Sequence, residues 1–101
     1  MNNALNNEQA LCDLLVARSV RYGNFTLASG KTSTVYVDAR LTTMSPEGLA
    51  LVGELGLSRI SSLGWNPDSI GGLTLGADPI AFAISYASAA TARPIRGLTV
   101  R

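Results

Sequence analysis

The chain contains no histidine, a single cysteine and few aromatic residues, which make up 6% of its 101 residues. Without histidine, a thiol–imidazole couple and a histidine-based metal site are both excluded. Cys12 alone cannot form an internal disulfide, and its place on the apolar side of the first expected helix predicts a packing role. We assign no metal-ligating residue in this chain.

Charge is also scarce, and long hydrophobic runs are missing. Charged residues make up 15% of the chain and the net charge is +1, so no broad basic face is available for nucleic acid or a membrane surface. Every apolar run is interrupted well before the ~18 residues that a membrane span requires, and the N-terminus lacks the order of a secretion signal. Because 47% of the residues are hydrophobic, we expect one cytoplasmic domain with a packed core.

The first half of the chain predicts a helix followed by a hairpin. Leucines at helical spacing indicate a helix over 7–20, with Asn6 and Gln9 as a weak capping box and the segment 22–24 as its end. Alternating residues predict two short strands around a Ser-Gly-Lys turn, at Phe25–Leu27 and Thr34–Asp38.

The second half predicts a helix and then a strand–helix–strand unit. Ser45 as a cap and Pro46 at the first position begin a helix that runs to about residue 63 and closes at Gly64. Glycines in its middle, at positions 53 and 56, predict close packing there. A strand over 69–73, a helix from Pro79 to about Thr91 capped by Asp78, and a strand over 97–100 then form a parallel α/β unit.

Two strands joined by one helix leave open sheet edges and one uncovered face. We therefore expect these residues to be the first half of a larger α/β domain. The alternative is a small α+β domain that dimerisation completes.

The expected hairpin tip combines groups suited to a small planar anion. Lys31 and Arg40 supply positive charge, Tyr36 supplies a ring for stacking, and hydroxyls and an exposed glycine backbone surround them: Ser29, Gly30, Thr32 and Ser33. The alternative is a solvated surface in which Asp38 and Arg40 form only a local ion pair.

The segment Gly71–Pro79 is a glycine-rich turn between an expected strand and an expected helix. Such a turn directs backbone N–H groups and the positive end of a helix dipole at one point, which favours an anion. It lacks the spacing of a Walker A loop and of a dinucleotide-binding loop. Anion binding and a purely structural turn both remain open on these residues alone.

Three segments resemble orotate phosphoribosyltransferases in order and spacing: Phe25–Arg40, Ser45–Gly53 and Gly71–Ile80. The combination of Phe-Thr-Leu-x-Ser-Gly-Lys with Gly-Gly-Leu-Thr-Leu-Gly-Ala-Asp-Pro is specific to that family. The last residues, Arg96–Arg101, are similar to the strand that enters the family's mobile catalytic loop. The resemblance implies an α/β fold of the type I phosphoribosyltransferase class, with an N-terminal hood over 1–44 and the first part of the core over 45–101.

This resemblance implies a glycosyltransferase of de novo pyrimidine synthesis. Such an enzyme transfers ribose 5-phosphate from 5-phosphoribosyl 1-diphosphate to orotate, which yields orotidine 5′-phosphate and diphosphate. The family binds Mg²⁺ through the diphosphate substrate and acts as a homodimer with shared sites.

By resemblance, Lys31 lies near the orotate carboxylate, while the Tyr36 ring and the Val37 backbone flank the base. The residues expected to bind the diphosphate are Thr74, Leu75, Gly76, Ala77, Asp78 and Arg101.

The chain departs from the family pattern at three places. Ala28 and Gly76 stand where many members have a lysine, and the mobile catalytic loop and the ribose-phosphate pocket would follow Arg101. The catalytic residues are therefore expected beyond Arg101, and the 101 residues alone are expected to be inactive. Two alternatives remain open: a non-catalytic relative that binds a phosphorylated ligand, and a phosphoribosyltransferase for another base, for which Ala28 leaves room.

Overall fold

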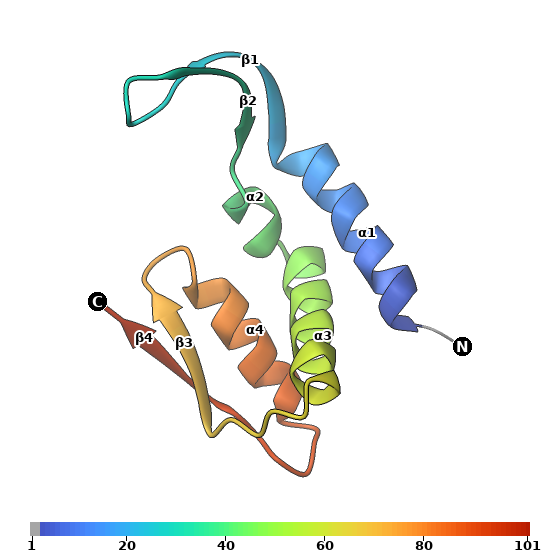
Figure 1. Cartoon of the computed structure of the whole chain (residues 1–101). Coiled ribbons are helices and arrows are strands. Elements are labelled where there is room, and N and C mark those ends of the chain that lie inside the picture. The colour runs from blue at the N-terminus through green and yellow to red at the C-terminus, as the bar shows by residue number, and fades with distance from the viewer. Residues whose placement is uncertain (1–2) are drawn as a thin grey trace.

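The structure is a computed structural model that describes residues 3–101, with side chains from residue 6 onward. Residues 1 and 2, which begin the predicted hood, lie outside the described residues. Figure 1 shows the elements in space. Along the chain they are α1 (Asn3–Arg18), β1 (Val20–Thr26), β2 (Thr32–Val37), α2 (Arg40–Thr43), α3 (Pro46–Ser62), β3 (Ser69–Leu73), α4 (Asp78–Ser88) and β4 (Arg96–Val100).

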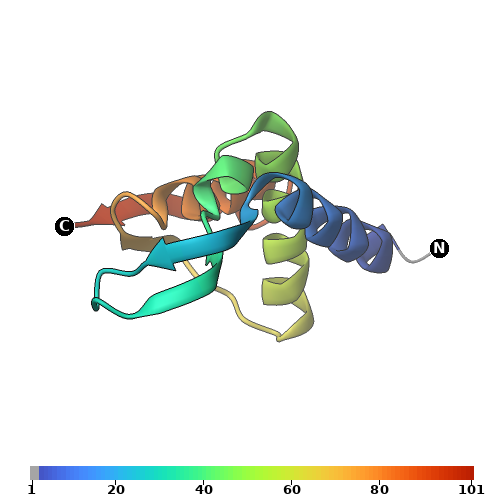
Figure 2. The same ribbon diagram turned by 90° about the horizontal axis from the view of Figure 1, so that it is seen from above.

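The core is a stack of layers, and a hairpin projects from it. Strands β3 and β4 form a two-stranded parallel sheet, α4 packs against that sheet, α3 packs against α4, and α1 packs against α3. Strands β1 and β2 form a separate antiparallel hairpin beyond the ends of α1 and α2. Figures 1 and 2 show the hairpin standing clear of the core sheet. This arrangement is the α/β fold with an N-terminal extension that the sequence predicts.

Small residues let α4 lie close to the core sheet. The sheet pairs in register from Ser69 with Arg96 to Leu73 with Val100, which confirms the predicted parallel unit. A Cβ atom on Gly97 would lie 2.8 Å from the Phe82 ring, so glycine is needed where this helix crosses β4. The buried hydrophobic side chains all belong to α4 or directly precede β4: Ala81, Ala83, Ile84 and Ile95.

The contact between α3 and α4 depends on the two glycines in α3. A Cβ atom on Gly53 would lie 2.6 Å from the carbonyl oxygen of Ala83, and one on Gly56 would lie 2.4 Å from Cδ1 of Ile84. The expectation of close packing at these positions is confirmed. The missing side chain at Gly53 allows the two helix backbones to approach each other directly, and the one at Gly56 leaves room for the Ile84 side chain.

The start and end of α3 also agree with the sequence. Ser45 Oγ accepts a hydrogen bond from Gly48 N at 3.0 Å, and Pro46 is the first helical residue. Gly64 follows the C-cap residue Leu63 with φ of +72°, a backbone conformation that glycine adopts readily. The capping residues therefore predict where this helix begins and, to within about one residue, where it ends.

The predictions for the first helix need correction. α1 spans Asn3–Arg18, so Asn6 lies inside it and does not cap it, and Gln9 donates a hydrogen bond to Asp13 instead. The helix ends before 22–24, because Val20 already begins β1. Cys12 is exposed and does not fill the core, since it lies on a side of α1 that no other described element covers.

The hairpin strands, α2 and α4 also differ from prediction. The hairpin strands are longer than expected, and Gly23 and Asn24 form an irregularity in β1 where the pairing register shifts. The short helix α2 was not predicted at all. α4 begins at Asp78, which is therefore a helical residue and not the cap, and it ends at Ser88 instead of near Thr91.

Candidate functional site

The hairpin carries an aromatic pair contributed by both of its strands. Tyr36 in β2 and Phe25 in β1 have ring centroids 5.5 Å apart at an interplanar angle of 35°. The Tyr36 side chain stays 42% exposed, so its ring can still contact a ligand. Val37 follows on the opposite face and is also exposed. Phe25 was not assigned a role from the sequence; its pairing with Tyr36 depends on the hairpin register.

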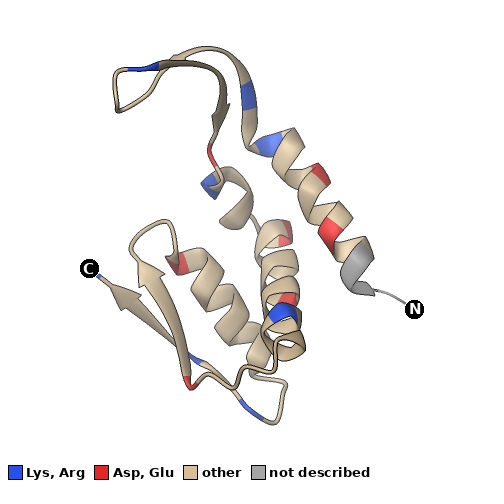
Figure 3. Ribbon diagram, viewed as in Figure 1, with Lys and Arg blue, Asp and Glu red and all other residues tan. Residues whose placement is uncertain are grey.

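Lys31 lies in the turn that joins β1 to β2. Leu27 N donates to Lys31 O at 2.8 Å and Gly30 N donates to Leu27 O at 2.9 Å, which closes the turn. Gly30 has φ of +85°, so glycine suits this position. Among the described residues no acidic group pairs with Lys31, and Figure 3 shows no acidic segment in this turn. The ammonium group is thus free to meet an anion.

Arg40 does not share the hairpin tip with Lys31, contrary to the sequence-based prediction. It begins α2, beyond the far end of β2, and its Nε lies 3.3 Å from Oδ1 of Asp38. Asp38 and Arg40 therefore form the local ion pair that the sequence left open as an alternative. The positive charge of the tip comes from Lys31.

The loop between β3 and α4 offers two free backbone N–H groups. Two other N–H groups of this loop are bonded, since Ala77 N donates to Leu73 O at 3.1 Å and Thr74 N donates to Val100 O at 2.9 Å. Leu75 N and Gly76 N have no acceptor within residues 3–101, and they lie in a turn whose Thr74–Leu75 peptide bond is cis. These two donors precede the start of α4, where the helix dipole favours negative charge.

Asp78 organises this loop from the first turn of α4. Thr74 Oγ1 donates to Oδ2 of Asp78 at 2.5 Å, and Asp78 N donates to Leu75 O at 3.1 Å. The other carboxylate oxygen, Oδ1, is covered and has no partner in the described chain. The carboxylate therefore holds the loop through Oδ2, while Oδ1 faces the protein.

Arg101 lies next to the start of this loop. Thr74 N donates to Val100 O at 2.9 Å, so the residue after Val100 leaves β4 beside Thr74. Arg101 itself is exposed. The parallel pairing of β3 with β4 thus brings together the residues that the sequence assigned to diphosphate binding, although they are separated by more than twenty positions.

The hairpin group and the loop group lie on the same side of the molecule but do not touch. Both views show the hairpin projecting toward the side where the β3–α4 loop and the end of β4 lie (Figures 1 and 2). The hairpin packs on itself and on α1, and not on β3 or α4. A cavity of about 580 Å³ lies elsewhere, beside Trp65 and Ile95, and a smaller hollow of about 400 Å³ lies at the hairpin base beside Arg40.

Comparison with known proteins identifies relatives of this chain. No protein-family model matches the chain. The orotate phosphoribosyltransferase of Aquifex aeolicus is 42% identical over 96 residues, which cover 92% of this chain and 51% of that protein. The Corynebacterium glutamicum enzyme is 38% identical over 102 residues, which cover 99% of this chain and 53% of that protein.

The solved structures agree with the sequence relatives. Orotate phosphoribosyltransferase of Mycobacterium tuberculosis in complex with Fe(III) dicitrate superposes with a TM-score of 0.79 at 39% identity, over 94% of this chain and 51% of that one. The same enzyme in complex with 5-phospho-α-D-ribosyl 1-diphosphate gives a TM-score of 0.73 at 38% identity, over 94% and 53%. In sequence and fold, the chain corresponds to the N-terminal portion of orotate phosphoribosyltransferases. It spans about half the length of the curated relatives that it matches.

This correspondence to orotate phosphoribosyltransferases confirms the predicted fold class. Within residues 3–101, no helix combines the length and the apolar character needed to cross a membrane. In the same residues, no three acidic or cysteine side chains gather where they could hold a metal ion.

Proposed function

We propose that this chain forms the base-binding and diphosphate-binding part of an orotate phosphoribosyltransferase. The reaction transfers ribose 5-phosphate from 5-phosphoribosyl 1-diphosphate to a ring nitrogen of orotate, and it releases orotidine 5′-phosphate and diphosphate for pyrimidine synthesis. The observation that carries the proposal is the β3–α4 loop with its free N–H groups at Leu75 and Gly76. The hydrogen bond from Thr74 N to Val100 O brings Arg101 beside the start of this loop. A relative of similar fold is known in complex with the same diphosphate substrate.

Orotate would bind at the hairpin. It is a flat ring with a carboxylate, so it needs a surface for its plane and a cation for its charge. The Tyr36 ring, braced by Phe25, supplies the surface, the Val37 backbone flanks the ring, and the unpaired ammonium of Lys31 supplies the cation. Ala28, which stands where many family members have a lysine, leaves Lys31 as the cation of the turn.

The diphosphate would bind at the β3–α4 loop. Backbone donors held in a fixed turn stabilise the negative charge that develops on the leaving diphosphate, and Arg101 adds a guanidinium that can bind two oxygens at once. Hydrogen bonds shape the turn: Thr74 Oγ1 donates to Asp78 Oδ2, Ala77 N donates to Leu73 O, and Asp78 N donates to Leu75 O. The substrate would arrive with Mg²⁺ bound to its phosphate oxygens, and the ion would offset part of their negative charge.

The same proposal covers the setting of the enzyme. It would act in the cytoplasm as a homodimer, with orotate and the phosphoribosyl diphosphate as its partners and no role for nucleic acid or a membrane. The homodimer is proposed because the resemblance to this family implies shared sites, and because the hairpin leaves large apolar side chains exposed, among them Tyr22, Val35 and Val37.

The experiment that tests the assignment compares two variants in the native protein. Lys31→Ala should raise the KM for orotate and leave the KM for the diphosphate substrate unchanged. Gly76→Val should raise the KM for the diphosphate substrate and leave the KM for orotate unchanged. A Cβ atom at Gly76 meets no protein atom within 4 Å, so its added bulk falls on the ligand and not on the fold. An unchanged KM for orotate in Lys31→Ala would refute the base assignment.

The test also separates the proposed enzyme from its alternatives. Binding of the diphosphate substrate without formation of orotidine 5′-phosphate would favour a non-catalytic relative that binds a phosphorylated ligand. Competition by purine bases, but not by orotate, would favour a phosphoribosyltransferase for another base.

A further inference from the structure

A small polar junction holds the hairpin at its base. α1 ends at Arg18 and β1 begins at Val20, so Ser19 alone connects them. The side chains of Ser19 and of Thr42 in α2 are both fully buried, at 0% exposure. Ser19 Oγ lies 2.6 Å from Thr42 Oγ1, and the two hydroxyls share a hydrogen bond. This contact joins the segment that enters the hairpin to the segment that leaves it.

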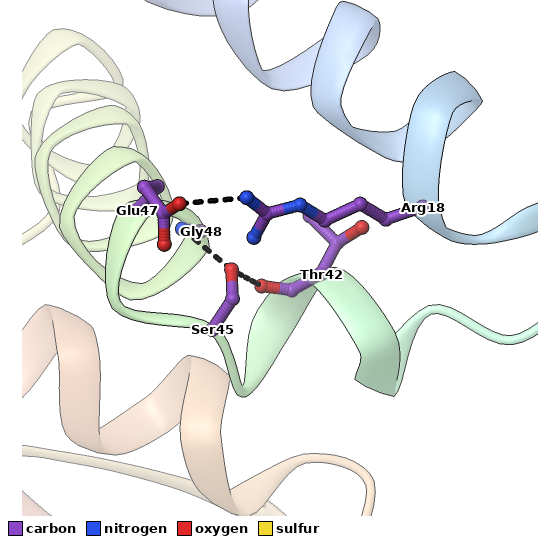
Figure 4. A network of polar contacts seen from close by, with 5 residues as sticks. All are labelled: Arg18, Thr42, Ser45, Glu47 and Gly48. Atoms are coloured by element: carbon purple, nitrogen blue, oxygen red, sulfur yellow. Dashed lines mark hydrogen bonds and ion pairs between the residues drawn. The ribbon is translucent and has the colours of Figure 1, made fainter.

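Thr42 is tied in turn to the start of α3. Its carbonyl oxygen accepts hydrogen bonds from Ser45 Oγ at 2.7 Å and from Ser45 N at 3.0 Å. Ser45 Oγ accepts from Gly48 N, and a Cβ atom on Gly48 would lie 1.8 Å from Thr42 O. Figure 4 shows this series of contacts from Thr42 through Ser45 to Gly48. Thr42 therefore lies between the hairpin base and the core.

A second link beside the junction is exposed and weaker. Arg18 donates to Glu47 at 2.6 Å, and both side chains remain at least 40% exposed. Ion pairs in this setting contribute little because water and salt screen them. The buried Ser19–Thr42 pair is not screened in this way, and it lies beside a backbone hydrogen bond from Asp38 N to Ser19 O at 2.9 Å.

A small rotation at this junction would move the hairpin tip by a larger distance. β1 has 7 residues, and a strand of that length spans roughly 20 Å, so a rotation of about 10° at its base would move the tip by roughly 3 Å. Beyond its own strands the hairpin packs only on α1 among the main contacts of the described chain. Displacements smaller than that can remove a bound substrate from reactive alignment.

We propose that Thr42 is a positioning residue whose hydrogen bond to Ser19 sets the angle of the hairpin over the β3–α4 loop. The proposal rests on the proposed function, because the hairpin carries Lys31 and Tyr36. When the Thr42 hydroxyl is removed, the buried Ser19 hydroxyl has no partner and the junction opens to water to solvate it. The hairpin then adopts further orientations, and apparent affinity falls with the fraction that remains competent.

The first measurement is a distance distribution between the hairpin tip and α3. Nitroxide labels on Ser29→Cys and Ser61→Cys, both exposed positions, are placed in a Cys12→Ser background and measured by pulsed electron paramagnetic resonance. Thr42→Val and Ser19→Ala should each broaden the distribution relative to the parent protein.

Two control variants separate orientation from general destabilisation. Thr42→Ser keeps the hydroxyl and should keep the parental distribution. Thr43→Val alters the neighbouring buried threonine of the same helix, which does not bond Ser19, and should also leave the distribution unchanged. A parental distribution in folded Thr42→Val would overturn the proposal. If Thr42→Val does not fold, Ser19→Ala tests the same hydrogen bond, because it removes the other hydroxyl of the pair.

Ligand titrations distinguish this proposal from the proposed function. Thr42→Val should raise the dissociation constant for orotate roughly tenfold and leave that for 5-phosphoribosyl 1-diphosphate unchanged, since its loop is held by the core. An equal loss for both ligands would mean a merely structural role and would overturn the proposal. Absence of orotate binding in the parent protein would refute the proposed function, while the label distances would still decide the role of the junction.

Discussion

The core and the hairpin are fixed in place by different kinds of interaction. In the core, backbones approach closely through glycine and alanine, as at Gly53 against Ala83, and the sheet is in register along its full length. Among the main contacts of the described residues the hairpin has no such packing on the core, and the buried hydroxyls of Ser19 and Thr42 are bonded to each other at its base. The core elements are thus held by close backbone packing, whereas we propose that the hairpin is oriented by a few hydroxyl groups at its base.

The largest expected loss of stability comes from a substitution at Gly48, where the hairpin base meets the core. In Gly48→Ala the new Cβ atom would lie 1.8 Å from Thr42 O, a backbone atom that cannot rotate away. We expect the free energy of unfolding to fall by about 3 kcal/mol, because overpacking forces the backbone to shift. Urea denaturation followed by circular dichroism measures this.

The control for Gly48→Ala is Gly76→Ala, whose Cβ atom meets open space. Its stability should stay within about 0.5 kcal/mol of the parent protein. Equal effects of the two substitutions would show that the junction is not tightly packed.

Within the core, two glycines of the same helix should respond differently to alanine. Gly53→Ala brings a Cβ atom to 2.6 Å from the fixed carbonyl oxygen of Ala83, and we expect a loss of about 2 kcal/mol. Gly56→Ala meets the end of the Ile84 side chain, which can change rotamer at a cost of about 1 kcal/mol that the gain in helix propensity offsets. Thermal unfolding of both variants tests the difference, and a larger loss for Gly56→Ala would contradict it.

A buried hydroxyl in the core provides the counterpart of the hairpin junction. Ser88 Oγ accepts from Ile95 N at 2.7 Å and donates to Ser85 O at 2.6 Å. Ser88→Ala leaves a buried N–H group without an acceptor, so we expect a loss of about 1.5 kcal/mol. The exposed Ser62→Ala, which loses a bond to Arg59 O, is the control and should change the denaturation midpoint little. Unlike Thr42→Val, Ser88→Ala should not broaden the hairpin distances.

The smallest effect concerns pH. The hydrogen bond from Arg18, followed by the backbone and the charge of Arg18, lowers the pKa of Glu47 below its ordinary value. A lowered pKa contributes stability above the ordinary carboxylate pKa, and this contribution is lost as the pH falls through the lowered value. Glu47→Gln should therefore lose less stability than the parent protein between neutral and acid pH. Parallel pH–stability curves would show that the pair contributes nothing.

The sequence predicted best what depends on neighbouring residues. The cap at Ser45 and Pro46 and the glycines around β3 fixed α3 and the strand that precedes the loop, and the bounds of β3 are confirmed. The end of α1 was wrong because Ser19 is held by Thr42, which lies 23 positions away. The short helix α2 was missed for the same reason, since it is stabilised by contacts with α1 and α3.

The candidate site likewise contains residues that the sequence places correctly and residues whose positions depend on contacts between distant segments. Thr74 to Asp78 are contiguous, and the β3–β4 pairing brings Arg101 to them, so the sequence sufficed for this group. Arg40 was misplaced because its position depends on where β2 ends, and the partnership of Phe25 with Tyr36 depends on a register shift in β1. The ligand roles of all these residues remain predictions.

The most direct test of the account is a pair of ligand titrations of the ¹⁵N-labelled chain followed by NMR. Orotate is predicted to shift the amide resonances of Lys31, Tyr36 and Val37, and the Mg²⁺ complex of 5-phosphoribosyl 1-diphosphate is predicted to shift those of Leu75, Gly76 and Arg101. Orotate shifts confined to the β3–α4 loop, or no shifts in the hairpin at saturating orotate, would contradict the assignment of base and diphosphate to these two regions.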